Sequence, residues 1–336
     1  MNRILLAFIM LLHVITISAD NKAQLLKLDE AIEQVEKLQT KKMMKIDMLR
    51  NSLRRSANDN ERMSLCYDIF NEFHVLQFDS ALHYIDKVHE MATRTGNRHI
   101  REMAIVDKAE LLGMGGFYPE AIELLDKEPL DSTDNKVMFK SYIAHFRIYL
   151  YWADYCNDAV FAPIYRERAS KNLETAMRFI GASPATEYYR GEYYIYVKHD
   201  NRNALECYFR VLRSTPHDAR EYAMAANAVA HNYSAKGDME HYEYYLIEAA
   251  HSDLLNCTRE NMALQDLAMF LYQQGEDNME RAERYINLAM EDAKLFNNRL
   301  RIIEISQKLP VIVGAYKQLM KRRNTMLRIS TFGVSA

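Results

Sequence analysis

The chain has 336 residues, and its 43 Lys and Arg against 46 Asp and Glu give a formal net charge of −3. Acidic and basic residues are mixed along the chain, which argues against a basic face for nucleic acid and against direct nucleic-acid binding by this chain. Only 10 Gly and 6 Pro occur, so we expect long helices joined by short turns.

Residues 1–19 have the pattern of a secretory signal peptide. Arg3 supplies a positive charge, an apolar run follows over residues 4–17, and Ser18 and Ala19 form a small-residue cleavage site. The run of about 14 residues is shorter than the roughly 20 that a membrane-spanning helix needs. The sequence therefore predicts export to the periplasm. A lipoprotein signal would need a cysteine at the cleavage site, and none lies near it.

Residues 20–57 read as one long amphipathic helix. Its apolar positions fit one heptad register, with Gln39 and Lys42 as polar breaks; they are Leu25, Leu28, Ile32, Val35, Ile46, Leu49 and Leu53. We expect a cap over the exposed face of the first repeat. The alternative is a coiled-coil helix that forms a homodimer.

Residues 58–297 carry a repeated helix-pair pattern. Ala204, Tyr208, Val211 and Pro216 have the spacing of the second helix of a tetratricopeptide repeat (TPR), in which a small residue lets two helices approach and proline follows the helix. Positions of this kind recur about every 40 residues, and the predicted repeat-packing positions are Ala81, Ala121, Ala204, Tyr208, Pro216 and Ala282. We therefore predict an all-α, right-handed TPR-type solenoid with long capping helices at both ends.

The predicted pairs are 60–76 with 79–95, 98–114 with 119–127, 136–155 with 162–180, 185–198 with 203–213, 217–235 with 239–255, and 261–274 with 278–296. Residues 298–336 form a last helix and tail, in which Pro310 predicts a kink.

Tyrosine is abundant, with 22 in the chain. If Ala204 sets the register, one stripe of first-helix residues would line the concave groove of the solenoid. The predicted groove residues are Tyr189, Tyr193, Tyr196, Asn227, His231, Ser234, Gln265 and Tyr272. Aromatic rings with polar tips, amides and hydroxyls suit a peptide or a glycan. For any single tyrosine, ordinary inter-helix packing is the favoured explanation.

Nothing in the sequence indicates catalysis, a cofactor or a metal. His83 and His89 are six residues apart, whereas two zinc ligands on one helix are typically four apart. No nucleophile elbow, phosphate-binding glycine loop or calcium loop occurs. The four cysteines are widely spaced along the chain: Cys66, Cys156, Cys207 and Cys257. We expect each to act as a small buried apolar residue, and the sequence leaves open whether any of them form disulfides.

The longest stretch of resemblance to a known family is HSDLLNCTRENMALQDLAMFLYQQGEDNMERAERYINLAMEDAKLFNNRLRIIEISQKLPVIVGAYKQ, at residues 251–318. FDSALHYIDKV and YCNDAVFAPIYRER add to it. Over residues 20–323 the chain resembles the exported half of membrane-anchored transcriptional regulators of Bacteroidetes. That resemblance implies a periplasmic TPR array followed, in relatives, by a transmembrane helix and a cytoplasmic DNA-binding domain.

This sequence departs from that pattern in its last residues, 321–336, where KRRNTMLRISTFGVSA contains no membrane span. We expect either a truncated regulator or a stand-alone relative. The resemblance favours a sensing or docking module that binds a peptide, a glycan or a partner protein and is not an enzyme. The alternatives are a structural dimerisation scaffold and a glycan-binding subunit of a nutrient-uptake system.

Overall fold

We analysed a computed structural model of the chain, which describes residues 20–128, 130–131, 133–260 and 262–334. The predicted signal peptide lies outside the described residues. Residues 20–33 form an N-terminal helix. The other helices are α2 (Val35–Arg55), α3 (Asp59–Phe73), α4 (Phe78–Thr95), α5 (Arg98–Met114), α6 (Tyr118–Lys127), α7 (Asn135–Cys156), α8 (Phe161–Ala176), α9 (Pro184–Tyr196), α10 (Asn201–Ser214), α11 (Arg220–Ala235), α12 (Met239–Asn256), α13 (Ala263–Gln274), the short η1 (Glu276–Asn278), α14 (Met279–Phe296) and α15 (Arg299–Val334).

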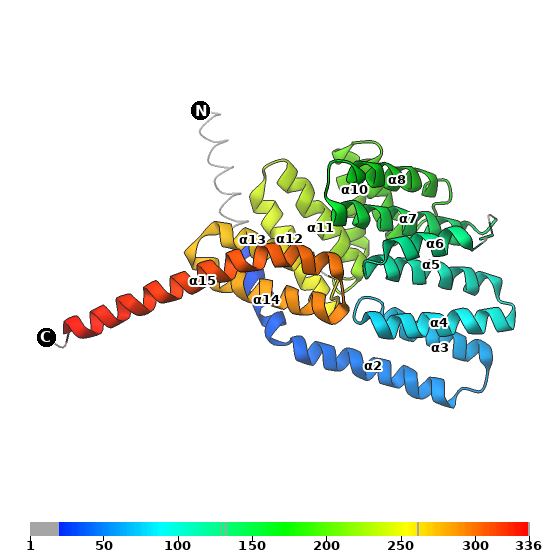
Figure 1. The fold of residues 1–336 in the computed structure, drawn as a ribbon, viewed down its shortest axis with the longest axis horizontal. Coiled ribbons are helices and arrows are strands. Elements are labelled where there is room, and N and C mark those ends of the chain that lie inside the picture. The colour runs from blue at the N-terminus through cyan, green and yellow to red at the C-terminus, as the bar shows by residue number, and fades with distance from the viewer. Residues whose placement is uncertain (1–19, 129, 132, 261, 335–336) are drawn as a thin grey trace.

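The helices from α3 to α14 pack as successive pairs, each helix mainly against its neighbours along the chain. Figure 1 shows these pairs stacked side by side along the array. The described residues contain no strand. The predicted all-α solenoid of TPR-like helix pairs is therefore confirmed.

The repeat-packing residues explain why the pairs are tight. Ala81, Ala121, Ala204 and Ala282 are completely buried, as is Tyr208; the remaining predicted position, Pro216, is exposed just beyond the end of α10. The ring of Tyr208 lies against Gly191 of α9, where a Cβ atom would be 2.4 Å from Tyr208 Cε1. Glycine at this position therefore permits the close approach of α9 and α10.

The N-terminal segment differs from the single capping helix expected over residues 20–57. A turn at Gln34 divides it into the N-terminal helix and α2. Ile46 of α2 packs on α3 and α4 as expected of a cap, but Leu25 and Leu28 pack into the cluster formed by α12, α13 and α14. The two apolar groups that share one heptad register thus serve two separate cores, and the turn lets the chain reach both.

The last helices contact the first repeats, so the array is closed. The Arg259 backbone N–H donates to the Val75 carbonyl at 2.8 Å, and Phe296 packs in the cluster of α3 and α4. At the start of α15 the Arg299 guanidinium lies over the Phe117 ring, 4.0 Å from its centroid. These contacts join segments far apart in sequence (Figure 1).

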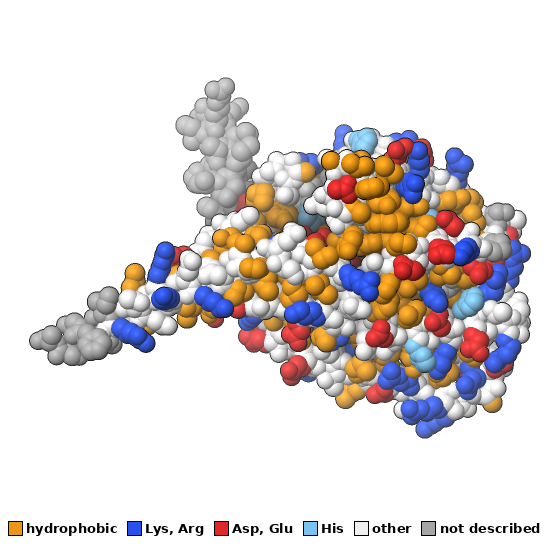
Figure 2. All heavy atoms as spheres, viewed as in Figure 1, with side chains coloured by type: hydrophobic (Ala, Val, Ile, Leu, Met, Phe, Trp, Pro, Cys, Tyr) orange, Lys and Arg blue, Asp and Glu red, His pale blue; other side chains and the backbone are white. Residues whose placement is uncertain are grey.

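α15 continues past the array as a long projecting helix with Pro310 inside it (Figures 1 and 2). Within the described residues no helix is both long and apolar enough to cross a membrane.

Candidate functional site

A cavity of about 290 Å³ lies among the first helices of three successive pairs, α7, α9 and α11. Asp253 of α12, the turn between α12 and α13, the first residue of α13 and one side chain of α15, Arg301, complete its lining. This volume is just below the range of about 300–1,000 Å³ that is typical of sites for drug-sized ligands. The cavity is therefore large enough for a small polar ligand.

One wall of the cavity is aromatic. Phe146 of α7 faces Tyr196 of α9, with their ring centroids 5.5 Å apart. The ring centroids of Tyr188 and Tyr189 are 5.2 Å apart. The start of α9 is fixed by a capping box between Ser183 and Thr186, so the helix presents these rings from a defined position. Such a wall provides flat apolar surface with polar tips.

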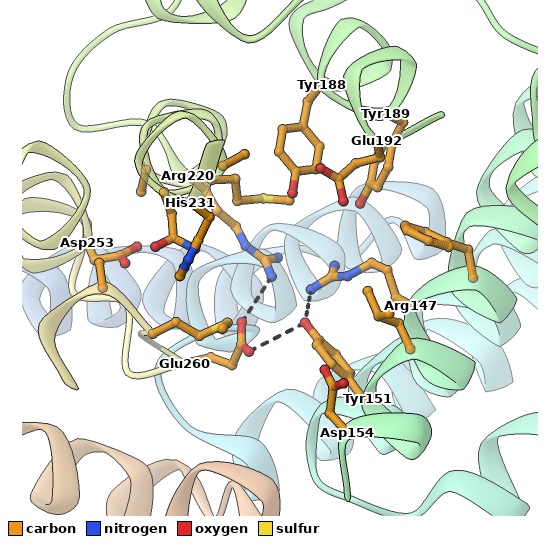
Figure 3. Close-up of a pocket in the computed structure, with 18 of the residues that line it drawn as sticks. Arg147, Tyr151, Asp154, Tyr188, Tyr189, Glu192, Arg220, His231, Asp253 and Glu260 are labelled. Carbon is orange, nitrogen blue, oxygen red and sulfur yellow. Dashed lines mark hydrogen bonds and ion pairs between the residues drawn. The ribbon is translucent and has the colours of Figure 1, made fainter. Parts of the chain in front are cut away.

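The floor of the cavity is a network of charged and hydroxyl groups (Figure 3). Arg147 Nη2 donates to the Tyr151 hydroxyl at 2.7 Å, and that hydroxyl donates to Glu260 Oε1 at 3.4 Å. Arg220 Nη2 lies 3.7 Å from Glu260 Oε2. Side chains from α7, α11 and the turn after α12 thus meet at one carboxylate.

A second buried carboxylate, Glu110 of α5, lies beneath Arg147 and forms an ion pair with it. Burial alone would raise the pKa of Glu110, but Arg147 and the other nearby basic groups lower it to about 2. Burial, followed by the neighbouring Arg220, lowers the pKa of His74 to about 3. The Glu110 carboxylate is therefore charged at neutral pH and the His74 imidazole is not.

α15 takes part in the site through Arg301, which is 2% exposed. Its Nη1 donates to Glu304 at 2.6 Å and its Nη2 lies 3.6 Å from Glu260 Oε1. Glu304 also accepts a hydrogen bond from the Gln265 amide at 3.0 Å. Glu260 therefore lies between the guanidinium of α11 and that of α15.

Two further acids border the cavity and bind protons readily. Burial raises the pKa of Glu192 to about 7, although the Tyr208 hydroxyl donates to its Oε1 at 2.6 Å. Burial, followed by the nearby Glu260, raises the pKa of Asp253 well above its usual range. Near neutral pH these acids add less negative charge than their number suggests.

The structure brings together four of the predicted groove residues, Tyr189, Tyr196, Asn227 and His231, which all line the cavity. The other four lie outside its lining: Tyr193, Ser234, Gln265 and Tyr272.

Three of the four predicted groove residues outside the cavity lining pack or bond elsewhere in the structure. Tyr193 packs with the cluster of α7 and α8, and Lys198 lies 5.2 Å from its ring centroid. Gln265 is buried beside Glu304, and Tyr272 packs on the cluster under the N-terminal helix. Successive residues of an α-helix are about 100° apart, so Tyr193, four residues after Tyr189, is rotated by about 40° around the helix axis from Tyr189. This rotation directs the Tyr193 ring away from the side that carries Tyr189 and Tyr196.

Sequence reasoning missed the charged floor, made by Arg147, Arg220, Glu260 and Arg301. A lone arginine in the apolar run FRIYLYW was a usable signal for Arg147, because an unpaired buried charge is costly. The other three residues follow no recognisable spacing.

No group of three or more potential metal ligands is found in the described part of the chain. The four cysteines are free thiols, three of them buried and Cys156 half-buried.

Comparison with protein-family models identifies the family to which the helical array is similar. Residues 32–307 match the family described as "SusR N-terminal TPR domain". A comparison with curated proteins found no significant match.

Proposed function

The chain belongs to the SusR N-terminal TPR domain family, and we propose that it acts as an exported sensing module of a membrane-associated regulatory system that binds a short glycan in the cavity of α7, α9 and α11. TPR arrays are scaffolds that bind other molecules. The observation that carries the proposal is the cavity lining, which combines aromatic rings with amide, hydroxyl and charged groups. Rings that stack on a sugar face and polar groups that bind its hydroxyls are what a glycan requires.

A glycan fits this cavity better than an extended peptide does. A peptide bound along a TPR array needs an open groove that crosses several repeats, whereas the contacts of Arg259 with Val75 and of Arg299 with Phe117 close this array. A short glycan, or the end of a longer one, needs only the local cavity.

A sensing role is supported by the position of Arg301. This side chain lines the cavity and lies at the start of α15, the helix that leaves the array. A ligand that changes the surroundings of Glu260 would change the contacts of Arg301 and hence the stability of the start of α15.

Two variants of α11 test the proposal. Asn227 lines the cavity, and its Oδ1 is buried without a hydrogen-bond partner among the described residues; Ser234, seven residues later, is outside the lining. Calorimetric titration of the purified chain with a panel of mono- and oligosaccharides should give weaker binding for Asn227→Ala and unchanged binding for Ser234→Ala. Equal effects of the two substitutions on binding would place the ligand elsewhere.

Docking of a partner protein is a second candidate, favoured by an exposed apolar patch at the junction of α7 and α8. The patch consists of Tyr155, Val160, Phe161 and Ile164, and Figure 2 shows apolar side chains gathered over these helices. Exposed apolar patches often mark protein interfaces. Loss of a co-purifying partner on Phe161→Asp, with glycan binding retained, would assign docking to this patch.

A further inference from the structure

Arg220 is the cavity guanidinium with the weakest pairing to protein carboxylates. Arg147 forms an ion pair with Glu110, and Arg301 donates to Glu304 at 2.6 Å. The Arg220 side chain has Glu260 at 3.7 Å, beyond hydrogen-bond distance. Its one hydrogen bond within the described residues is to His74 Nδ1 at 3.2 Å, and a guanidinium has five donors.

Glu260 is the carboxylate that forms an ion pair with Arg220; the charged Glu110 also acts on Arg220, but it is itself paired with Arg147. Burial, followed by Arg220 itself, lowers the pKa of His74 to about 3, so this imidazole is neutral. Glu260 is shared, because Arg301 Nη2 lies 3.6 Å from its other oxygen. The positive charge of Arg220 therefore faces the cavity with donors to spare.

Each of the remaining acids at the cavity has either a raised pKa or a basic partner. Glu192 accepts from Tyr208, and burial raises its pKa to about 7. Burial raises the pKa of Asp253 well above its usual range. Asp154 is paired with Arg166 at 3.0 Å. An anionic ligand would consequently meet less repulsion here than the number of acids suggests, since an acid that holds its proton can donate to the ligand.

Two buried polar atoms at the cavity also lack partners among the described residues. Arg301 Nε is an unused donor, and Asn227 Oδ1 is an unused acceptor. Unused buried donors and acceptors are costly unless a ligand or water satisfies them. Both atoms are covered from water by neighbouring side chains, so a ligand reaches them only if those side chains shift; one with both an anionic oxygen and hydroxyl groups would then satisfy both kinds of atom.

We propose that the cavity selects a sugar that carries a carboxylate, a hexuronic acid, and that Arg220 binds this carboxylate while Asn227 accepts from a sugar hydroxyl. This inference rests on the proposed glycan-binding function and narrows it to acidic sugars. A carboxylate matches the planar fork of a guanidinium, and the charge-assisted pair is strong in a partly buried site. The aromatic rings of α9 remain available for the apolar face of the sugar.

Calorimetric titration of the full chain with three probes at neutral pH tests the inference. The probes are galacturonic acid, its neutral methyl ester and galactose, which differ mainly at the carboxyl carbon. We expect the acid to bind at least about tenfold more tightly than the ester, as is typical when one charge-assisted contact is lost. Arg220→Gln should abolish this preference. Arg202→Gln should leave it unchanged, because Arg202 lies on α10 with its side chain 90% exposed.

Arg220→Lys, which keeps the charge and loses the fork, provides a second variant if Arg220→Gln does not fold; it should reduce the preference for the acid over the ester. Equal binding of acid, ester and galactose would overturn the selection for a carboxylate and leave the glycan-binding function standing. Binding of trialanine through its free carboxylate, with no binding of any sugar, would overturn both the selection for an acidic sugar and the glycan-binding function.

Discussion

The Tyr285 hydroxyl of α14 donates a hydrogen bond to Asp29 of the N-terminal helix at 2.7 Å. The residues are 256 positions apart, and Arg281 and Arg284 also bind this carboxylate. Asp29 thus joins the start of the described chain to its last helix pair. Closure of the array depends on such long-range contacts, and the cavity lies within the closed array.

We expect Asp29→Ala to destabilise the fold by about 2 kcal/mol, because hydrogen bonds to charged groups contribute roughly 1.5–3 kcal/mol. Urea denaturation measures the change. Asp47→Ala serves as the control, since Asp47 is exposed and its ion pair is with Arg50 on the same helix, an arrangement that contributes little. Equal stability of the two variants would show that the N-terminal helix is not held by Asp29.

Leu28→Glu should unfold or loosen the N-terminal helix, because Leu28 is completely buried against α12–α14. Truncation of such a leucine costs about 2–5 kcal/mol, and a buried charge costs more. Leu26→Glu, at a position 56% exposed, should stay within about 0.5 kcal/mol of wild type. Thermal melts and light scattering distinguish this role from dimerisation. A well-folded Leu28→Glu protein with half the wild-type mass would support a dimer.

Glu192 should make stability depend on pH. Burial raises the pKa of this folded-state carboxyl from 4.5 to about 7, so the folded chain binds a proton that the unfolded chain releases. Stability contributed at this site is therefore present at low pH and is lost as pH rises from about 4.5 to about 7. Glu192→Gln keeps an acceptor for Tyr208 and removes the titration. Relative to wild type, the variant should gain up to about 3 kcal/mol across that interval. Parallel stability curves for the two proteins would contradict the assignment.

Tyr193→Ala should lower stability and leave glycan binding unchanged, because the ring packs with the cluster of α7 and α8 outside the cavity. A half-buried aromatic should cost less than the roughly 3–5 kcal/mol of a fully buried one. Tyr189→Ala, in the cavity lining, should weaken binding. Thermal melts and titrations of both variants separate packing from recognition. Loss of binding in Tyr193→Ala alone would reverse the two roles.

The helix pairs could be predicted because their signals are local. Ala204, Tyr208 and the spacing of small residues define a helix pair within one segment of sequence. The same register put Tyr189, Tyr196, Asn227 and His231 on one side of their helices, which is where the cavity lies.

The charged floor could not be predicted, because it depends on closure of the array. Arg147, Arg220, Glu260 and Arg301 come from four segments that span more than 150 positions, and no spacing relates them. The turn at Gln34 was also hidden, since the heptad register continues through it. Long-range packing decides both features.

Hydrogen–deuterium exchange with the tightest-binding sugar of the panel is the most direct test of the central claim that the cavity of α7, α9 and α11 is the ligand site. We expect slower exchange in peptides from α9, from the start of α11 and from the turn around Glu260, since ordering by a ligand reduces local opening. The start of α15 should change with them through Arg301. Slowed exchange confined to the apolar patch of Tyr155, Val160, Phe161 and Ile164, with the cavity helices unchanged, would contradict the account.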